Sequence, residues 1–169
     1  AAAIDKTRIY QDTENQAVRL DQLYDISATI SSSLDLEEVV DSLTRGLTVL
    51  LNASSAFFCE YDPQKKSLTV HNQFVTEGMK DSLPDNNVTF HLTDDIPIHY
   101  LFEGPFNLDF GIPYTKENLQ QSLASYHVQS SLIVPLIDEG TLMGITFVCE
   151  SRFERHSLPN EITLARSLA

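Results

Sequence analysis

Apolar residues recur at helical intervals near the start of the chain. Between residues 4 and 34 there is no Gly or Pro, and the apolar positions lie three, four and seven residues apart: Ile9, Leu20, Leu23, Ile26 and Ile30. This pattern predicts one long amphipathic helix. The ladder Ile9, Gln16, Leu23, Ile30 fits a short coiled coil. Packing of the same face on its own domain is the alternative, and it is favoured for the second half.

A second helix is predicted to begin at Asp35. The side chain of Asp35 can accept hydrogen bonds from free backbone N–H groups, and Glu38 three residues later resembles the partner in a capping box. The helix should end near Asn52. Its apolar residues mark one buried face: Val39, Val40, Leu43, Leu47, Leu50 and Leu51.

The pattern then changes to that of β-structure. Residues 56–61 are aromatic and apolar on both faces, which is typical of a strand covered on two sides. Turn residues 62–66 follow, and residues 67–74 read as the returning strand of a hairpin.

A second hairpin gives the strongest strand signal. Residues 131–137 and 142–150 are apolar arms joined by a short turn at 138–140. Pro135 cannot donate a ladder hydrogen bond, so its nitrogen should face a bulge or an unpaired edge. From Leu158 onward, helical spacing predicts a final helix with Ile162, Ala165, Leu168 and Ala169 on one side.

The segment between the hairpins is irregular. Its first half is predicted to contain a polar loop at 78–87, a strand at 88–92 and a helix from Asp94 to Gly104. A short strand at 106–108 and a Gly- and Pro-rich loop at 109–114 follow. The segment ends with a helix that is capped by Thr115 and carries Leu119, Leu123 and Tyr126. Strands joined by hairpins predict an α/β fold of the α+β type. We expect an antiparallel sheet with the terminal helices on one face and this excursion on the other.

Composition narrows the function. The 169 residues and 42% hydrophobic content suit one domain, which looks like a piece of a longer protein. A net charge of −13 repels phosphates and anionic lipids, so we expect no nucleic-acid partner and no direct membrane contact. No apolar run reaches the ~20 residues that span a bilayer and no signal peptide is evident, so we expect a cytoplasmic location.

Catalytic signals are weak. Cys59 and Cys149 lie in strand-like segments without metal-ligand spacing, which favours buried free thiols. The acidic pairs Asp94-Asp95 and Glu37-Glu38 are explained by helix capping. There is no nucleophile elbow, phosphate-binding glycine loop or H-E-x-x-H motif, so no catalytic residue is assigned and the chain is not expected to be an enzyme.

Several strings together resemble the GAF family of sensory domains: residues 23–27, 31–40, 57–62 and 131–136, with Gly140 and Gly144-Ile145. The resemblance spans residues 22–169 and is vaguest between 76 and 129. It implies a GAF/PAS-like, six-stranded antiparallel sheet, a small-molecule pocket under the excursion, and homodimerisation through the N- and C-terminal helices. Residues 1–21 would form a linker or signalling helix, with a histidine kinase or similar output elsewhere in the full protein.

By position, the candidate pocket is lined by Phe58, His99, Tyr100, Phe102, Asp109, Tyr114, Tyr126 and His127. For any one of these aromatic residues, simple core packing is the alternative. No metal ligand is assigned, and the identity of the small-molecule ligand is unknown.

Cofactors are constrained by comparison with relatives of this family. His99 or His127 could ligate haem, but a lone His near apolar residues is more often structural. Neither His follows a Cys, which speaks against a covalent bilin. The cyclic-nucleotide motif is not matched, because Glu150-Ser151 and Asn160-Glu161 stand at its approximate places. Two further functions remain open, a ligand-free dimerisation module and a thiol reductase that uses Cys59 and Cys149.

Overall fold

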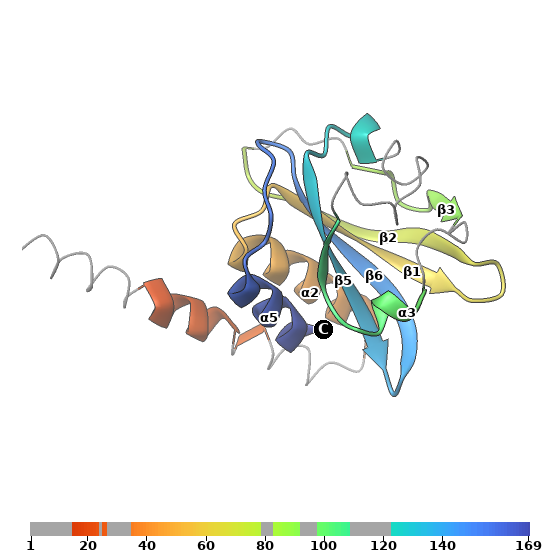
Figure 1. Cartoon of the computed structure of the whole chain (residues 1–169), viewed down its shortest axis with the longest axis horizontal. Helices are drawn as coiled ribbons and strands as arrows, with labels where there is room; N and C mark the ends of the chain where they lie inside the picture. The colour runs from red at the N-terminus through yellow and green to blue at the C-terminus, as the bar shows by residue number, and fades with distance from the viewer. Residues whose placement is uncertain (1–14, 24, 27–34, 79–82, 92–97, 109–122) are drawn as a thin grey trace, which may run out of the picture.

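A six-stranded sheet in the order β3-β2-β1-β6-β5-β4 forms the centre of the molecule, and all neighbouring strands are antiparallel. The computed structural model describes residues 15–23, 25–26, 35–78, 83–91, 98–108 and 123–169 (Figure 1). The elements are β1 (Ser55–Asp62), β2 (Ser67–Val75), β3 (Thr89–His91), β4 (Phe106–Leu108), β5 (Ser130–Asp138), β6 (Thr141–Glu150), α2 (Leu36–Leu50), α3 (Ile98–Leu101) and α5 (Pro159–Leu168). The predicted fold class is confirmed.

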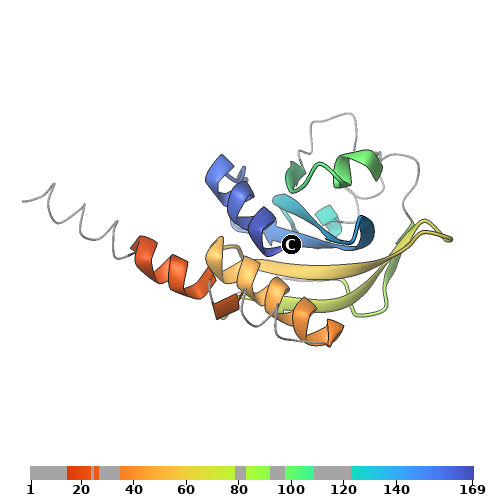
Figure 2. The same ribbon diagram turned by 90° about the horizontal axis from the view of Figure 1, so that it is seen from below.

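Helix α2 begins where its capping residue predicts. Asp35 is extended, and its Oδ1 accepts a hydrogen bond of 3.0 Å from the backbone nitrogen of Glu37. The helix ends at Leu51, after which Asn52 adopts a left-handed φ of 49°. Leu43 and Leu47 are fully buried, and the helix lies along β1 and β2 (Figure 2).

The two predicted hairpins meet at the pairing of β1 with β6. Phe57 lies opposite Phe147, and their rings stack with centroids 4.8 Å apart and planes 10° from parallel. Both rings are buried. This contact joins two hairpins that are each local in sequence into one sheet.

The sheet carries a separate core on each side. The helical face packs against α2 and α5 through a cluster that includes Leu43, Leu47, Leu132, Val134, Val148 and Ala165. The opposite face, called the front face below, packs against the excursion through a cluster that includes Phe57, Phe147, Leu101, Leu108, Leu123 and Val128. The predicted placement of terminal helices and excursion on opposite faces is therefore confirmed for the described residues.

Helical residues 15–23 lead away from the domain (Figures 1 and 2). Leu23 and Ile26 pack against the helical-face core, and Ile26 lies so close to α2 that a Cβ on Gly46 would come within 2.7 Å of its Cδ1. Val18 and Leu20 are 52% and 53% exposed. Packing on the domain is thus confirmed where this helix meets α2. Earlier in the helix, the apolar side chains of Val18 and Leu20 are exposed.

Pro135 lies on β5 beyond the point where the pairing with β4 ends. The pairing of β4 with β5 ends at Phe106 opposite Ile133, while Pro135 still faces Ile145 of β6. The expectation of an unpaired edge at this proline is confirmed among the described strands. The predicted elements at 92–97 and 109–122 lie outside the described residues.

Gly144 is the tightest point of the sheet. A Cβ at this position would clash with the carbonyl oxygen of Cys59 on β1 and with the ring of Phe58. Because a backbone atom is one of the obstacles, the neighbours cannot move aside without disturbing the β1–β6 pairing.

Gly144→Ala should therefore lower the free energy of unfolding by about 3 kcal/mol, measured by urea denaturation. Thr146→Val in the same strand is the matched control, because the buried Thr146 hydroxyl has no hydrogen-bond partner among the described residues and its removal should not destabilise. Equal stability of Gly144→Ala and the unmodified chain would contradict the close approach.

Candidate functional site

Three of the sequence-predicted pocket residues lie on or beside α3. His99 is exposed, and its ring lies 4.5 Å from that of Tyr100, which is half-buried. Phe102 is 46% exposed. The residue that α3 buries in the front-face core is Leu101, which the pocket prediction had not included.

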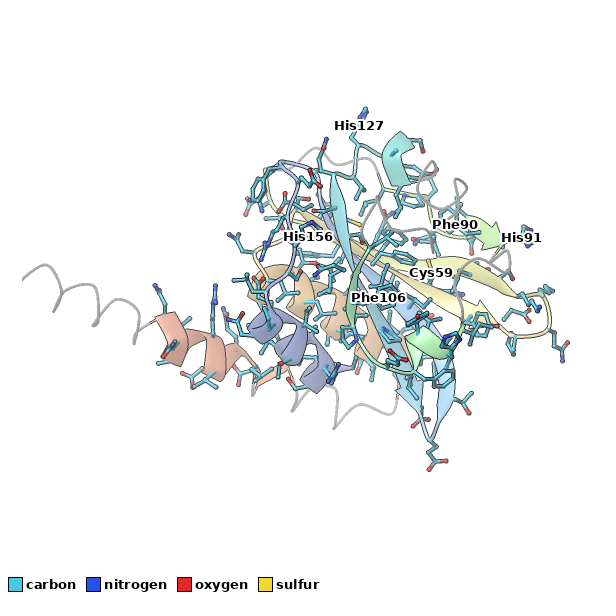
Figure 3. The ribbon with its side chains drawn as sticks, in the orientation of Figure 1. Cys59, Phe90, His91, Phe106, His127 and His156 are labelled. Atoms are coloured by element: carbon cyan, nitrogen blue, oxygen red, sulfur yellow. The ribbon has the colours of Figure 1, made fainter. Side chains whose placement is uncertain are left out.

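Two further candidates lie at the other end of the front face. Tyr126 is half-buried and packs against the front-face core, whereas His127 is exposed and has a left-handed φ of 60°. In the shared orientation of Figures 1 and 3, α3 lies at the lower right and His127 at the top of the molecule. The structure therefore does not bring α3 and His127 together. Asp109 and Tyr114 lie outside the described residues.

Phe58 lies on the other side of the sheet. It is buried against α2 on the helical face, whereas its neighbours Phe57 and Cys59 belong to the front-face core. Phe58 therefore cannot line a pocket shared with Tyr100 and Tyr126, and its assignment to the front-face pocket is wrong.

The two cysteines are core residues of the front face. Both are buried free thiols, and Cys59 lies at the sheet centre (Figure 3). Burial, with a smaller contribution from Cys149, raises the pKa of the Cys59 thiol far above its ordinary value. Cys149 of β6 pairs with Ser55 of β1, which lies four residues from Cys59. The two thiols are therefore farther apart than a disulfide can span. This arrangement does not support thiol reductase chemistry.

The described part of the chain holds no group of three or more His, Cys, Asp or Glu side chains that could bind a metal ion. None of its helices combines the length and hydropathy needed to cross a membrane.

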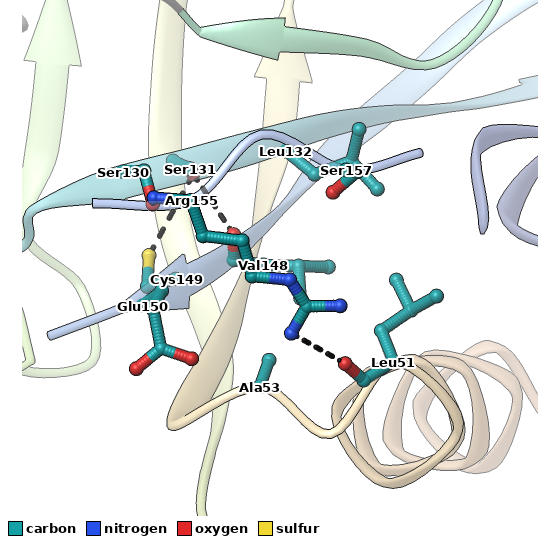
Figure 4. Close-up of a pocket in the computed structure, with 10 residues that line it drawn as sticks. All are labelled: Leu51, Ala53, Ser130, Ser131, Leu132, Val148, Cys149, Glu150, Arg155 and Ser157. Carbon is teal, nitrogen blue, oxygen red and sulfur yellow. Dashed lines mark hydrogen bonds between the residues drawn. The ribbon is translucent and has the colours of Figure 1, made fainter. Parts of the chain in front are cut away.

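A polar junction ties the ends of β6, α2 and α5 together (Figure 4). Arg155 donates to the carbonyl oxygen of Leu51 at the end of α2 (2.8 Å) and forms an ion pair with Glu161 in the first turn of α5. Glu161 also accepts from the backbone nitrogen of Leu158 at 2.8 Å. The cavity at this junction has about 20 Å³, room for roughly one water molecule, so it holds no larger ligand.

Glu150 completes the junction at the end of β6. Its carboxylate is buried and accepts hydrogen bonds from the Arg152 guanidinium at 2.6 and 2.7 Å. Burial would raise the pKa of Glu150, but the hydrogen bonds and charge of Arg152, with the charge of Arg155, outweigh it and lower the pKa below its ordinary value. Glu150 and Glu161, which stand near the places of the cyclic-nucleotide motif, are thus engaged in internal ion pairs.

Sequence reasoning missed this junction. The available signal was Glu150 at the end of a buried strand, followed within five residues by Arg152 and Arg155. A buried acid needs a cation nearby, but which carboxylate each arginine would reach depends on the path of the loop.

The fold and junction define an α+β sheet domain with helices on one face and a crossing segment on the other. Solved structures with this architecture include the chromophore-binding domain of a Stigmatella aurantiaca bacteriophytochrome, with TM-score 0.67 and 15% identity over 89% of this chain. The phycoerythrobilin-bound GAF domain of a cyanobacterial phytochrome gives 0.68 and 20%, covering 89% of each chain. The GAF domain of Thermosynechococcus elongatus PixJ gives 0.65 and 19%, covering 89% of this chain and 83% of that one.

The chain therefore has the fold of a GAF domain. It spans 57% of the length of the Stigmatella fragment. No protein-family model and no curated protein match the sequence.

The residues described do not suit the covalent attachment of a bilin. Cys59 and Cys149 are the chain's two cysteines, and both point into the close-packed front-face core from strands. A thioether bond needs a thiol that a ligand can reach, and neither of these buried cysteines provides one.

Glu150→Gln tests the junction through pH. Because the folded-state pKa of Glu150 lies below its ordinary value of 4.5, the ion pair stabilises the fold above that pH, and its contribution disappears as pH falls through the lowered pKa. The variant should lose about 2 kcal/mol at pH 7 and show a shallower decline of stability between pH 5 and 3. Urea denaturation across this range measures both. Glu154→Gln, an exposed acid, is the control, and identical acid slopes for Glu150→Gln and the unmodified chain would contradict the assignment.

Proposed function

We propose that the chain is a sensory GAF domain without catalytic activity of its own, which binds a small molecule non-covalently at its front face and regulates a cytoplasmic signalling protein such as a histidine kinase. The observation that carries this proposal is the GAF-domain fold, which the chain shares with photosensory domains at 14–20% identity. Two of these neighbours are bilin-bound domains, which makes ligand sensing the function that the architecture supports best.

Two half-buried aromatic residues support ligand binding at the front face. Tyr126 packs against the core on which the excursion lies, and Tyr100 is half-buried next to Leu101, which α3 places in that core. The core of this face includes the apolar residues Leu101, Leu123 and Val128, which are buried. A ligand with an apolar ring system would suit these surroundings.

The polar junction supports signal transmission from the sheet to the terminal helices. Arg155 contacts both the end of α2 and the start of α5, while Glu150 at the end of β6 holds the neighbouring Arg152. A shift of β6 caused by a ligand would therefore be passed to the end of α2 and the start of α5.

Homodimerisation through the terminal helices completes the proposal. Residues 15–23 extend from the domain with Leu20 exposed, and α2 adds Val49, which is also exposed. A second copy could bury these side chains.

A ligand-free dimerisation module is the second candidate. It is favoured by the close packing of the front-face core, where Leu101, Leu123 and Ile133 are almost completely buried. In this case the helices, and not a pocket, would perform the function.

Native mass spectrometry of the freshly purified chain separates these two functions. A sensor should retain a small molecule above the 19.0 kDa chain mass, and Tyr126→Ala or Tyr100→Ala should reduce the retained fraction several-fold. Phe153→Ala removes an exposed aromatic ring outside the front face and is the control. No retained mass and no thermal shift with a metabolite library would favour the ligand-free module.

Leu20→Glu tests dimerisation. Leu20 lies three residues from Leu23, on the face of the predicted heptad ladder, so a charge there should weaken self-association at least tenfold in analytical ultracentrifugation. Val18→Glu is the matched control. Val18 is as exposed as Leu20, but its side chain projects from the helix about 160° away from that of Leu20. Equal effects of both variants, or a monomeric unmodified chain, would count against this interface.

A further inference from the structure

A hollow of about 330 Å³ opens on the helical face, between the first turns of α2 and strands β1, β2 and β6. It lies on the opposite side of the sheet from the front face. Its volume is at the lower end of the range of small-molecule pockets.

A break in the register of β2 builds one wall of the hollow. Phe58 of β1 faces Asn72 and Cys59 faces Val70, so His71 is an extra residue in β2. Because of this bulge, the consecutive residues His71 and Asn72 both line the hollow.

A second break, in β6, builds the opposite wall. Leu136 of β5 faces Gly144 and Ile137 faces Leu142, so Met143 is the extra residue and also lines the hollow. The next residue, Gly144, has no side chain, which leaves room for the ring of Phe58. Two bulges on either side of β1 thus turn additional side chains toward one place, as bulges near functional sites commonly do.

The floor and the mouth of the hollow are apolar. Val40 and Phe58 are buried at its base, while Leu36 is about half exposed at its mouth. An occupant therefore needs an apolar body.

The polar groups around the hollow are mainly acceptors. The carboxylates of Glu37 and Glu60 line it, and Nε2 of His71 lies 2.8 Å from Oε2 of Glu60, which orients that carboxylate. The Asn72 amide nitrogen donates to Asp41, whereas its enclosed Oδ1 has no hydrogen-bond partner among the described residues. These acceptors call for a ligand that donates.

The charges around the hollow also favour a ligand that is a cation. The first turn of α2 is capped by Asp35 and carries Glu37 and Glu38, so acidic groups outweigh the partial positive charge of the helix end. Arg45 of α2 is paired with Asp41 and lies over the ring of Phe74. The chain as a whole has a net charge of −13, which attracts cations.

We propose that this hollow binds a small organic amine, with the ammonium group at Glu37 and Glu60 and the apolar body against Phe58 and Met143. The site does not depend on the proposed front-face sensor function. It would place a second ligand directly beneath α2, the helix that packs on residues 25–26.

The test uses 2-phenylethylamine as the probe, with 2-phenylethanol and 3-phenylpropionate as neutral and anionic analogues of similar size. Calorimetric titration of the unmodified chain at neutral pH should show saturable binding of the amine. The alcohol should bind at least tenfold more weakly, and the carboxylate should not bind. Glu60→Gln and Glu37→Gln should each weaken amine binding about tenfold. Glu38→Gln removes the same charge one residue away and should leave the affinity unchanged.

Methyl-¹³C methionine labelling locates the bound amine. The chain has two methionines, and Met143→Leu assigns the Met143 signal. That signal should shift with amine and saturate at the calorimetric affinity.

Several results would overturn the proposal. They are no saturable amine binding, equal binding of the alcohol, an unaffected Glu60→Gln variant, or a Met143 signal that ignores the amine. A Met143 signal that shifts with protein concentration alone would show that a second copy covers the hollow, which would also exclude the amine site.

Discussion

The pairing of β1 with β6 is the constraint on which the rest of the structure depends. Each hairpin alone leaves the outer edge of β1 or β6 unpaired. The pairing of residues 55–60 with residues 144–149, which includes the stacked rings of Phe57 and Phe147, joins the hairpins into a sheet wide enough to support a core on both sides. Once this pair is formed, α2 and α5 have one surface to cover and the excursion has the other. The same burial makes Cys59 and Cys149 core residues instead of reactive thiols.

The two faces of the sheet have different chemical characters. The described front face is covered by aliphatic side chains, with Tyr126 packed beside them. The helical face combines a similar core with two polar regions, the acid-rimmed hollow at the start of α2 and the arginine junction at its end. Helix α2 thus lies between two charged regions, one at each of its ends.

The likeness to phytochrome-type domains rests on architecture, since identity with them is 10–20%. What the chains share is the strand order and the two-sided cladding of the sheet, which depend on where apolar residues recur and not on which ones they are. The residues that would define a ligand are not carried by such a pattern.

The sequence by itself determined the elements that depend only on residues close together in the chain. Asp35 starts α2 because its side chain accepts from Glu37, the two tight turns define their hairpins, and Pro135 marks an edge because it lacks a donor. Tertiary structure alone decided which face Phe58 occupies, because a strand buried on both sides shows no alternation, and a bulge shifts the parity of its neighbour. It also decided that His127 lies far from α3 and that Arg155 reaches α2 and α5, since both depend on how segments distant in sequence are brought together.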